Sequence, residues 1–348
     1  MRRLFTIFGT TLVALLLTAG PTLACGGLIG PNGAVNLLRT TTFAGYHEGV
    51  EHYVTAFKFA GGGGAFGSLI PLPGVPSEVE KGGDWTLQRL IRETAPPVPD
   101  ALRLFGAASP AASAQVLMER KIDALDITVL KGGANEVGKW AKDHGFRLPP
   151  DAPQVLDFYA KRSPIFLAAA FDPTRAEARG QQIGDGTSVH ITIPTPNPWV
   201  PLRILALGKK GVESVQADVF LLTDRQPTLL PVGTTPGVDL AYDAQASTPL
   251  LNDLRSDRGM DWVPGSAWLS KVAIDAKASD LAFDLAIDAS GQGTPSRVAA
   301  GLDLPALPAP PRPFDVAQMM IGIGGIGLVI LSIFWLLSRP TAGRPISQ

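Results

Sequence analysis

Cysteine is almost absent from this chain of 348 residues, which contains only Cys25. One cysteine cannot form an internal disulfide, and it excludes zinc or iron–sulfur sites built from several thiolates. Basic residues are not in excess either, because 30 Lys and Arg stand against 31 Asp and Glu. A nucleic-acid-binding protein needs surplus positive charge to release counterions from phosphates. We therefore expect no nucleic-acid partner.

High net charge and low hydrophobicity, the two marks of disorder, are also missing. The net charge is −1 and 45% of the residues are hydrophobic. Such a chain can bury enough apolar surface to fold. Its length suits one large core or two smaller ones.

The N-terminus is typical of a secretory signal peptide. Two arginines in residues 1–3 precede the apolar segment 4–18, and small residues lead to Ala24. This order predicts cleavage before Cys25, so that residues 1–24 are removed. Two alternatives stay open. The segment is an uncleaved anchor, or Cys25 is lipidated, although the residues before it match a lipoprotein signal poorly.

A second hydrophobic segment lies near the C-terminus. Residues 316–337 carry no charge, and at 1.5 Å per residue they extend roughly 33 Å as a helix, enough to cross a bilayer. The tail 338–348 contains Arg339 and Arg344 but no acid. The positive-inside rule then predicts a cytoplasmic tail, with the bulk of the chain extracytoplasmic in the cell membrane. The lipid bilayer is thus a predicted partner, and a protein or small-molecule partner stays unknown.

The sequence between these ends divides by composition. We predict an extracytoplasmic domain at 25–231, and an extension or small subdomain at 232–288. Five prolines between Pro305 and Pro313 indicate a stiff stalk within 289–315.

The predicted fold class is α+β, with a mixed, mostly antiparallel sheet and a few short helices, plus one C-terminal transmembrane helix. Strands outnumber helices and do not alternate regularly with them. Alternating or β-branched segments predict strands at 37–43, 53–59, 122–130, 165–171, 189–193, 199–207 and 216–222, and residues 68–76 are expected to form a short strand that leaves through a proline-rich turn. Periodicity and capping residues predict helices at 85–93, 134–144, 153–162 and 249–258, with Asp84 capping the first.

The pair His47 and His52 invites comparison with a zinc site. The two are five residues apart, which on a helix places them roughly 140° apart, and on a strand on opposite faces. Only a loop could bring them together, and no third ligand is apparent. We expect them on the polar tip of a hairpin formed by residues 45–51.

The other candidate residues favour structural roles. Asp143 and His144 lie at a predicted helix end, where a histidine stabilises the helix C-terminus. His190 lies in an alternating strand. The aspartates 253, 257 and 261 lack calcium-loop spacing and are expected on solvated surface. No hydrolase or phosphate-loop motif occurs, so the sequence predicts no catalytic, cofactor-binding or metal-binding residue and no cofactor.

Several weak motifs occur in a characteristic order. They are Ala24–Gly27, LIPLPGVP at 69–76, WAKDHGFRLP at 140–149, VLDFYAKRSPIFLAAAF at 155–171 and PTPNPWVPLRIL at 194–205. This succession, over roughly residues 24 to 231, resembles the bacterial exported-protein family designated domain of unknown function 2330 (DUF2330). The resemblance implies export, often with a C-terminal anchor, and no established activity or site residue. Relatives commonly have further cysteines near the start, which this chain lacks.

Three functional hypotheses follow. The first is a membrane-anchored, non-catalytic binding or scaffold module of the cell envelope. The second is an exported enzyme, possibly a hydrolase, with a dispersed site whose first candidate residues are His47, His52, Asp143 and His144. The third is a subunit of a membrane complex, joined through the glycine-bearing segment 316–337.

Overall fold

The structure is a computed structural model, and it describes residues 27–31, 33–34, 40–58, 65–95, 117–181 and 186–303. The predicted signal peptide, Cys25, residues 304–315 of the predicted stalk, the predicted membrane span and the tail lie outside these residues. Within the described part of the chain, no helix combines the length and the apolar character needed to cross a membrane.

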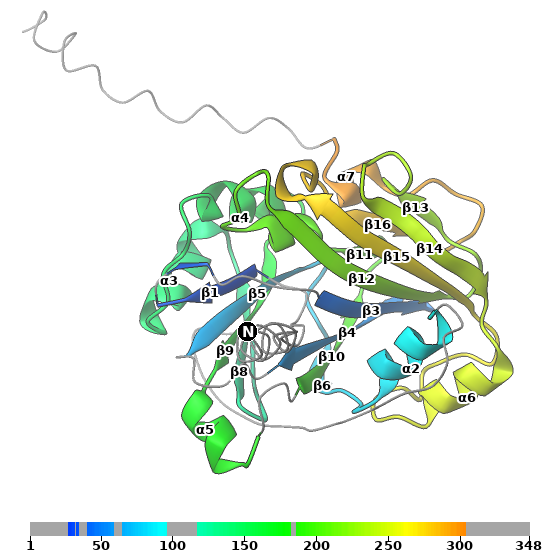
Figure 1. Ribbon diagram of the computed structural model, residues 1–348, viewed down its shortest axis with the longest axis horizontal. Coiled ribbons are helices and arrows are strands. Elements are labelled where there is room, and N and C mark those ends of the chain that lie inside the picture. The colour runs from blue at the N-terminus through cyan, green and yellow to red at the C-terminus, as the bar shows by residue number, and fades with distance from the viewer. Residues whose placement is uncertain are drawn as a thin grey trace, which may run out of the picture. The chain divides into compact units, whose positions relative to one another are not determined.

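Most of the strands belong to two sheets (Figure 1). The seven-stranded sheet has the order β14 (Val238–Gln245), β15 (Trp268–Lys277), β12 (Ser214–Thr223), β3 (Thr40–His47), β4 (Val50–Lys58), β10 (Gly186–Pro194) and β6 (Glu78–Lys81). The six-stranded sheet has the order β2 (Gly33–Ala34), β1 (Gly27–Gly30), β5 (Phe66–Leu72), β9 (Ile165–Phe171), β8 (Leu125–Lys131) and β7 (Met118–Ile122). A short third sheet has the order β11 (Trp199–Val200), β16 (Leu285–Asp288) and β13 (Thr228–Leu230).

Pairing among these strands is mostly antiparallel, as the sequence predicts. Among the described pairs, β12 with β3 is parallel and the others are antiparallel. Strand β12 lies between β15 and β3, and its apolar residues from Val219 to Leu222 are buried. Strands with both faces covered read as continuous hydrophobic runs, which explains why this segment is recognisable in the sequence. The mixed α+β class is therefore confirmed.

The helices are short. They are α2 (Thr86–Glu93), α3 (Ala134–Asp143), α4 (Ala152–Ala160), α5 (Pro173–Ala178), α6 (Thr248–Arg255) and α7 (Arg297–Ala300), with 3₁₀ turns η1 (Arg203–Ala206) and η2 (Ala278–Asp280). Four of them agree with the predicted helices to within a few residues. The predicted cap of α2 is wrong, because the residue at the cap position is Trp85, and the Thr86 N–H donates to the buried carboxylate of Asp257 rather than to the Asp84 side chain.

The predicted strand 199–207 is also wrong over most of its length. Extended pairing stops after Val200, and η1 follows. Pro201 has no N–H to donate to a ladder. The N–H groups of Leu202 and Arg203 instead donate to the buried Asp284 carboxylate, at 2.6 and 2.9 Å, and this turns the chain away from the sheet.

Two apolar clusters fill the fold. The larger includes residues of both main sheets, α3 and α4. The smaller lies where α2 and α6 pack together against the seven-stranded sheet (Figure 1). It includes Phe43, Phe220 and Leu254. The outer face of that sheet, covered by these helices, carries the first candidate site.

Residues beyond 231 join the same sheets. Strand β15 pairs with β12 along its whole length, and β16 pairs with β11 and β13. Residues 289–303, within the range predicted as a stalk, contribute α7, whose Ala300 is fully buried.

Candidate functional site

The hairpin of β3 and β4 is tighter than the sequence suggests. Its turn consists of Glu48 and Gly49, with φ of 50° and 82°, and His47 pairs directly with Val50. Two successive residues at positive φ are what a two-residue hairpin turn requires, and glycine adopts that conformation freely. The predicted tip at 45–51 is therefore wrong, and His52 lies within β4 rather than on a polar tip.

Strand pairing places three histidines on one face of the sheet. His47 lies opposite Val50, and Val54 lies opposite His190. Because residues two apart share a face, His47, His52 and His190 all point to the side covered by α2 and α6. The turn between the strands removes the obstacle posed by a spacing of five along one strand.

Three side chains form a chain of hydrogen bonds across β4, β10 and β6. His52 Nδ1 lies 3.1 Å from His190 Nε2, and His190 Nδ1 lies 3.1 Å from Glu80 Oε1. A carboxylate only accepts, so the pattern assigns the His190 proton to Nδ1. His190 Nε2 then accepts the Nδ1–H of His52. We call Glu80, His190 and His52 the histidine cluster.

Burial keeps both imidazoles of the histidine cluster uncharged. His190 is 3% exposed and His52 is 9% exposed. Loss of hydration lowers the pKa of both, to about 3 for His52, and the nearby His190 and His47 lower the pKa of His52 further. Glu80 acts in the opposite direction on His190, because a carboxylate favours the imidazolium.

Trp262 covers this cluster. Its ring stacks on His52, with the centroids 3.9 Å apart and the planes within 5° of parallel. The contact depends on Gly45 of β3, because a Cβ at this position would overlap the Trp262 ring. The Trp262 Nε1 atom is buried without a hydrogen-bond partner among the described residues.

The remaining candidate residues from the sequence divide into two groups. His47 lies on the same face as the histidine cluster, where its Nδ1 is 2.7 Å from Asp224 Oδ1. Asp143 and His144 lie elsewhere: Asp143 pairs with Lys139, and the His144 ring stacks on Trp140 while its Nδ1 lies 2.8 Å from the Trp140 carbonyl oxygen. The structure therefore brings His47 and His52 to one face and does not bring Asp143 and His144 there.

A cleft of about 360 Å³ opens beside the β3–β4 turn. It is lined by residues from four segments: Tyr46, Glu48 and Gly49; Pro196, Asn197 and Pro198; Asp224; and Ile287, Asp288, Ala289, Ser290, Thr294, Pro295 and Ser296. The lining combines carboxylates, hydroxyls and an amide with one aromatic ring. Asp224 belongs to the lining and also contacts His47. It therefore connects the cleft to the sheet face that carries His47, His52 and His190.

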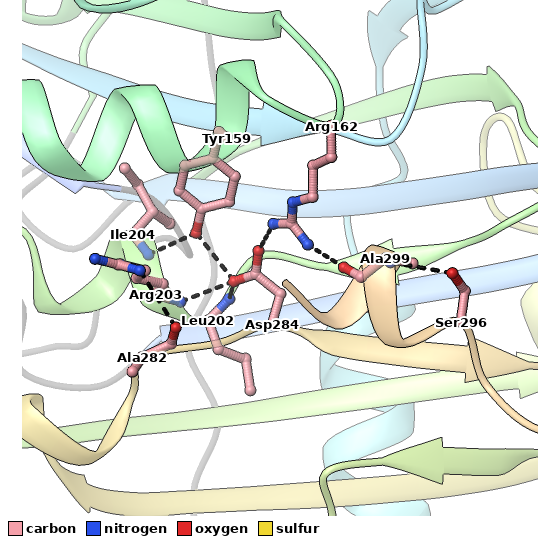
Figure 2. A network of polar contacts seen from close by, with 9 residues as sticks. All are labelled: Tyr159, Arg162, Leu202, Arg203, Ile204, Ala282, Asp284, Ser296 and Ala299. Atoms are coloured by element: carbon pink, nitrogen blue, oxygen red, sulfur yellow. Dashed lines mark hydrogen bonds and ion pairs between the residues drawn. The ribbon is translucent and has the colours of Figure 1, made fainter. Parts of the chain in front are cut away.

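The wall of the cleft formed by residues 287–296 is fixed at both ends by one buried network (Figure 2). Asp284, fully buried, accepts hydrogen bonds from Leu202 N, Arg203 N and Arg162, and from the Tyr159 hydroxyl at 3.0 Å. Arg162 also donates to the Ala299 carbonyl in α7. These residues form the core of what we call the Asp284 network.

Aromatic rings surround the cation of this network. The Arg162 guanidinium lies 4.1 Å from the Trp199 ring centroid and 4.7 Å from that of Phe158. Burial lowers the pKa of Arg162 to about 10, so it remains charged at neutral pH. Ser296, which lines the cleft, caps α7 by accepting from Ala299 N. The network thus holds the cleft wall by charge, hydrogen bonds and ring contacts together.

A third buried acid lies on the inner face of β4. Glu51 is fully buried, accepts from Trp199 N at 3.3 Å, and leaves Oε1 without a partner among the described residues. Burial raises its pKa to about 8, so the carboxyl group is protonated at neutral pH.

A metal centre finds no support in the described residues. They contain no group of three His, Cys, Asp or Glu side chains arranged to hold a metal ion. The side chains of the histidine cluster are instead joined to one another by hydrogen bonds.

A family model matches more than half of the chain. The family is described as an uncharacterized protein conserved in bacteria, DUF2330, and the match covers residues 21–226. The chain belongs to this family. The predicted resemblance is confirmed, and both imidazoles of the histidine cluster lie within the region that defines DUF2330.

Similarity to other known proteins is weak for this DUF2330 protein. No curated protein matches it. Among solved structures, it is similar to baculovirus P35, with 8% identity over 72% of this chain and 96% of that one and a TM-score of 0.38. A caspase-cleaved P35 mutant has 10% identity over 72% and 99% at the same score, and the caspase-8/P35 complex has 9% over 72% and 90% at 0.34. Scores below 0.5 support no conclusion about this chain.

Sequence reasoning missed Glu80 and underrated His190 and Asp257. His52 and His190 are 138 residues apart, and Asp257 contacts Thr86 across 171 residues. The expectation of a solvated surface is wrong for Asp257, which is 7% exposed. One local signal existed: His190 alternates with Val189 and Ile191, which places it on the face opposite those two apolar residues.

Proposed function

We propose that this DUF2330 protein is a binding module of the bacterial cell envelope, held in the cell membrane by residues 316–337 with its bulk outside the cytoplasm. The hydrophobic ends of the sequence support the anchoring and the orientation. The cleft beside the β3–β4 turn is the observation that supports binding, because its polar groups converge in one concave surface.

The chemistry of the cleft favours a hydroxyl-rich ligand such as a cell-wall saccharide. Glu48, Asp224 and Asp288 offer carboxylate acceptors, and Asn197 offers both a donor and an acceptor. The Tyr46 ring offers an apolar face to the C–H groups of a sugar ring. The Asp288 carboxylate has less capacity to accept from a ligand, because it already accepts hydrogen bonds from Ser290 and Gly293.

Binding is tested with the full-length protein in detergent micelles and soluble saccharide fragments of the bacterial cell wall as the probe. Fragments at 100 times their dissociation constant should stabilise the folded state by about 2.7 kcal/mol and raise the melting temperature. Asn197→Ala and Asp224→Asn should abolish this rise.

The matched control is Asp239→Asn. It makes the same chemical change at an exposed position of β14, away from the cleft lining. No saccharide-dependent rise in the wild type, or an equal loss in the control, would contradict the proposal. Orientation is tested separately with a tag after Gln348, which should be inaccessible from outside intact cells.

A second candidate, an exported enzyme, is favoured by one observation. The hydrogen bonds from Glu80 through His190 to His52 fix the tautomer of each imidazole, as in active sites where a carboxylate orients a catalytic base. His52→Asn would then abolish turnover of a substrate. If saccharide fragments bind but are recovered unchanged, the binding module stands and this candidate is lost.

A further inference from the structure

The segment that covers the histidine cluster, residues 256–264, is held firmly at its two ends. At the first end, Asp257 accepts hydrogen bonds from Trp85 N and Thr86 N at the start of α2. At the other end, Arg255 donates to the carbonyl groups of Val263 and Pro264, at 2.8 and 3.1 Å. We call residues 256–264 the Trp262 segment.

The middle of the Trp262 segment rests on the histidine cluster. Trp262 stacks on His52 through parallel rings. Gly259 has a φ of 71°, and a Cβ on it would lie 2.9 Å from both Glu80 Oε1 and His190 Nδ1. The backbone therefore passes directly over the Glu80–His190 hydrogen bond, and it covers His190, whose side chain is 4% exposed.

We propose that the histidine cluster is an acid-responsive latch, which holds the Trp262 segment closed while both imidazoles are neutral and releases it when they gain protons. The device depends on geometry: two imidazole nitrogens lie 3.1 Å apart under a segment whose ends are fixed to the rest of the fold. Between these ends, Met260 and Val263 donate their N–H groups to carbonyls of the segment itself, and Trp262 meets the cluster by ring stacking.

The first proton can be accommodated within the closed segment. His190 becomes an imidazolium that donates Nδ1–H to Glu80 and Nε2–H to His52 Nδ1. The proton formerly on His52 Nδ1 is then carried on its Nε2. Each nitrogen facing another group still has a complementary partner.

The second proton cannot be accommodated. With both rings protonated, His52 Nδ1–H and His190 Nε2–H point at each other, and two positive charges face each other in a poorly hydrated site. Other ionisable groups facing the pair are Glu78 and Glu80 of β6, Asp261 of the Trp262 segment and His47 of β3. The acids favour protonation of His190, whereas His47 and His190 oppose that of His52. Opening exposes His52 to water and removes this conflict.

The size of the effect follows from His52. Burial lowers its pKa to about 3 in the closed state from 6.5 when hydrated, so between these values the open state binds the extra proton. The ratio of open to closed segment should increase roughly 100-fold between pH 7.5 and pH 4.5.

Hydrogen exchange of the full-length protein in detergent tests this inference. After correction for the intrinsic pH dependence of exchange, the protection factor of residues 256–264 should fall roughly 100-fold between pH 7.5 and pH 4.5. Strand β9, fully buried, should keep its protection and so report that the fold is intact. A fall of less than threefold in the segment would overturn the proposal.

Two variants remove the titrating rings with little change of shape. His52→Asn retains a donor near the Nδ1 position, and His190→Gln retains an acceptor near Nε2. Each should reduce the pH-dependent fall at least tenfold. His144→Asn is the matched control, since it makes the same substitution at a histidine outside the cluster, and it should leave the fall unchanged. An undiminished fall in both cluster variants, with β9 protected, would also overturn the proposal.

Gly45→Ala tests the role of Trp262 while leaving both histidines of the cluster in place. The added Cβ displaces the Trp262 ring directly. The segment should therefore lose its protection already at pH 7.5, with little further change on acidification. A Gly45→Ala protein that stays protected at pH 7.5 would show that Trp262 does not hold the segment.

Discussion

The Asp284 network and the histidine cluster bury polar side chains in two different ways. In the Asp284 network a carboxylate meets a guanidinium, and each is held by further hydrogen bonds. In the histidine cluster the imidazoles are buried without charge, and their neutral tautomers fit one another. Burial penalises a charge unless an opposite charge compensates it, or unless the group becomes neutral. The second solution depends on pH, and the first does so far less.

Among the variants that test this comparison, Asp284→Asn should lower the free energy of unfolding the most. It leaves the Arg162 cation buried without its counter-charge, and breaking a buried pair costs about 3–5 kcal/mol. We expect the free energy of unfolding, measured by chemical denaturation of the full-length protein, to fall by about that amount.

The control makes the same change in an exposed pair. Asp303→Asn removes the partner of Arg297, and this pair lies in water. We expect no measurable change in the unfolding midpoint. Equal effects at positions 284 and 303 would show that burial does not distinguish the two pairs.

Glu51→Gln sharpens the comparison, because Glu51 is a buried acid that has become neutral. Its pKa is about 8 in the folded protein and 4.5 when hydrated, so the unfolded state releases a proton between these values. Wild-type stability should therefore fall as pH rises from about 4.5 to 8. Glutamine at this position should remove that slope and stabilise the protein by about 3 kcal/mol at pH 7.

The measurement for Glu51→Gln is the free energy of unfolding at several pH values between 4 and 8. Wild type and variant should converge at pH 4, where both side chains are neutral in both states. Parallel curves across the range would mean that Glu51 is charged in the folded protein.

Asp257→Asn tests a third way of burying a carboxylate, in which backbone N–H groups replace a cation. Asp257 accepts from Asp84 N, Trp85 N and Thr86 N, together with the Thr86 hydroxyl. Loss of this cap on α2 should cost about 1–2 kcal/mol. Asp253→Asn, in the half-exposed pair with Arg89, is the control and should change the melting temperature much less.

His52→Asn should have the smallest effect on stability at pH 7, because its contribution appears only in acid. Because the His52 pKa is lowered, the unfolded state binds more protons below pH 6.5, so wild-type stability falls as pH decreases toward 3. The variant should lose less stability than the wild type on acidification, by about 2 kcal/mol at pH 5. Urea denaturation at pH 7 and pH 5 gives this difference, and an unchanged pH dependence would contradict the neutral state of the cluster.

Local patterns predict much of the fold. The apolar run 165–171 is recognisable as a buried strand because every one of its residues is covered. The helix α3 is recognisable because Gly145, at a φ of 75°, ends it in the conformation that glycine adopts freely. Strand β14 escapes prediction, because it lies at a sheet edge and is largely exposed, so it lacks an apolar alternation.

The candidate site could not be predicted in the same way. Its contacts join β4 to β10, and α2 to the segment after α6, across more than a hundred residues. Composition reveals that histidines are few, but not which of them become neighbours. The turn at Glu48–Gly49 decides that His47 and His52 share a face, and its length is not evident from hydrophobic periodicity.

The Asp284 network shows that the folded part of this chain extends beyond the region matched by the family model. The family match stops at residue 226, yet Asp284 and Ala299 supply the counter-charge and the carbonyl for Arg162. A polypeptide truncated at that boundary would retain a cation wedged between aromatic rings with nothing to neutralise it, and β12 would lose its neighbour β15. The residues beyond the match are therefore part of the folding unit, and shortened versions of the protein should extend at least through α7.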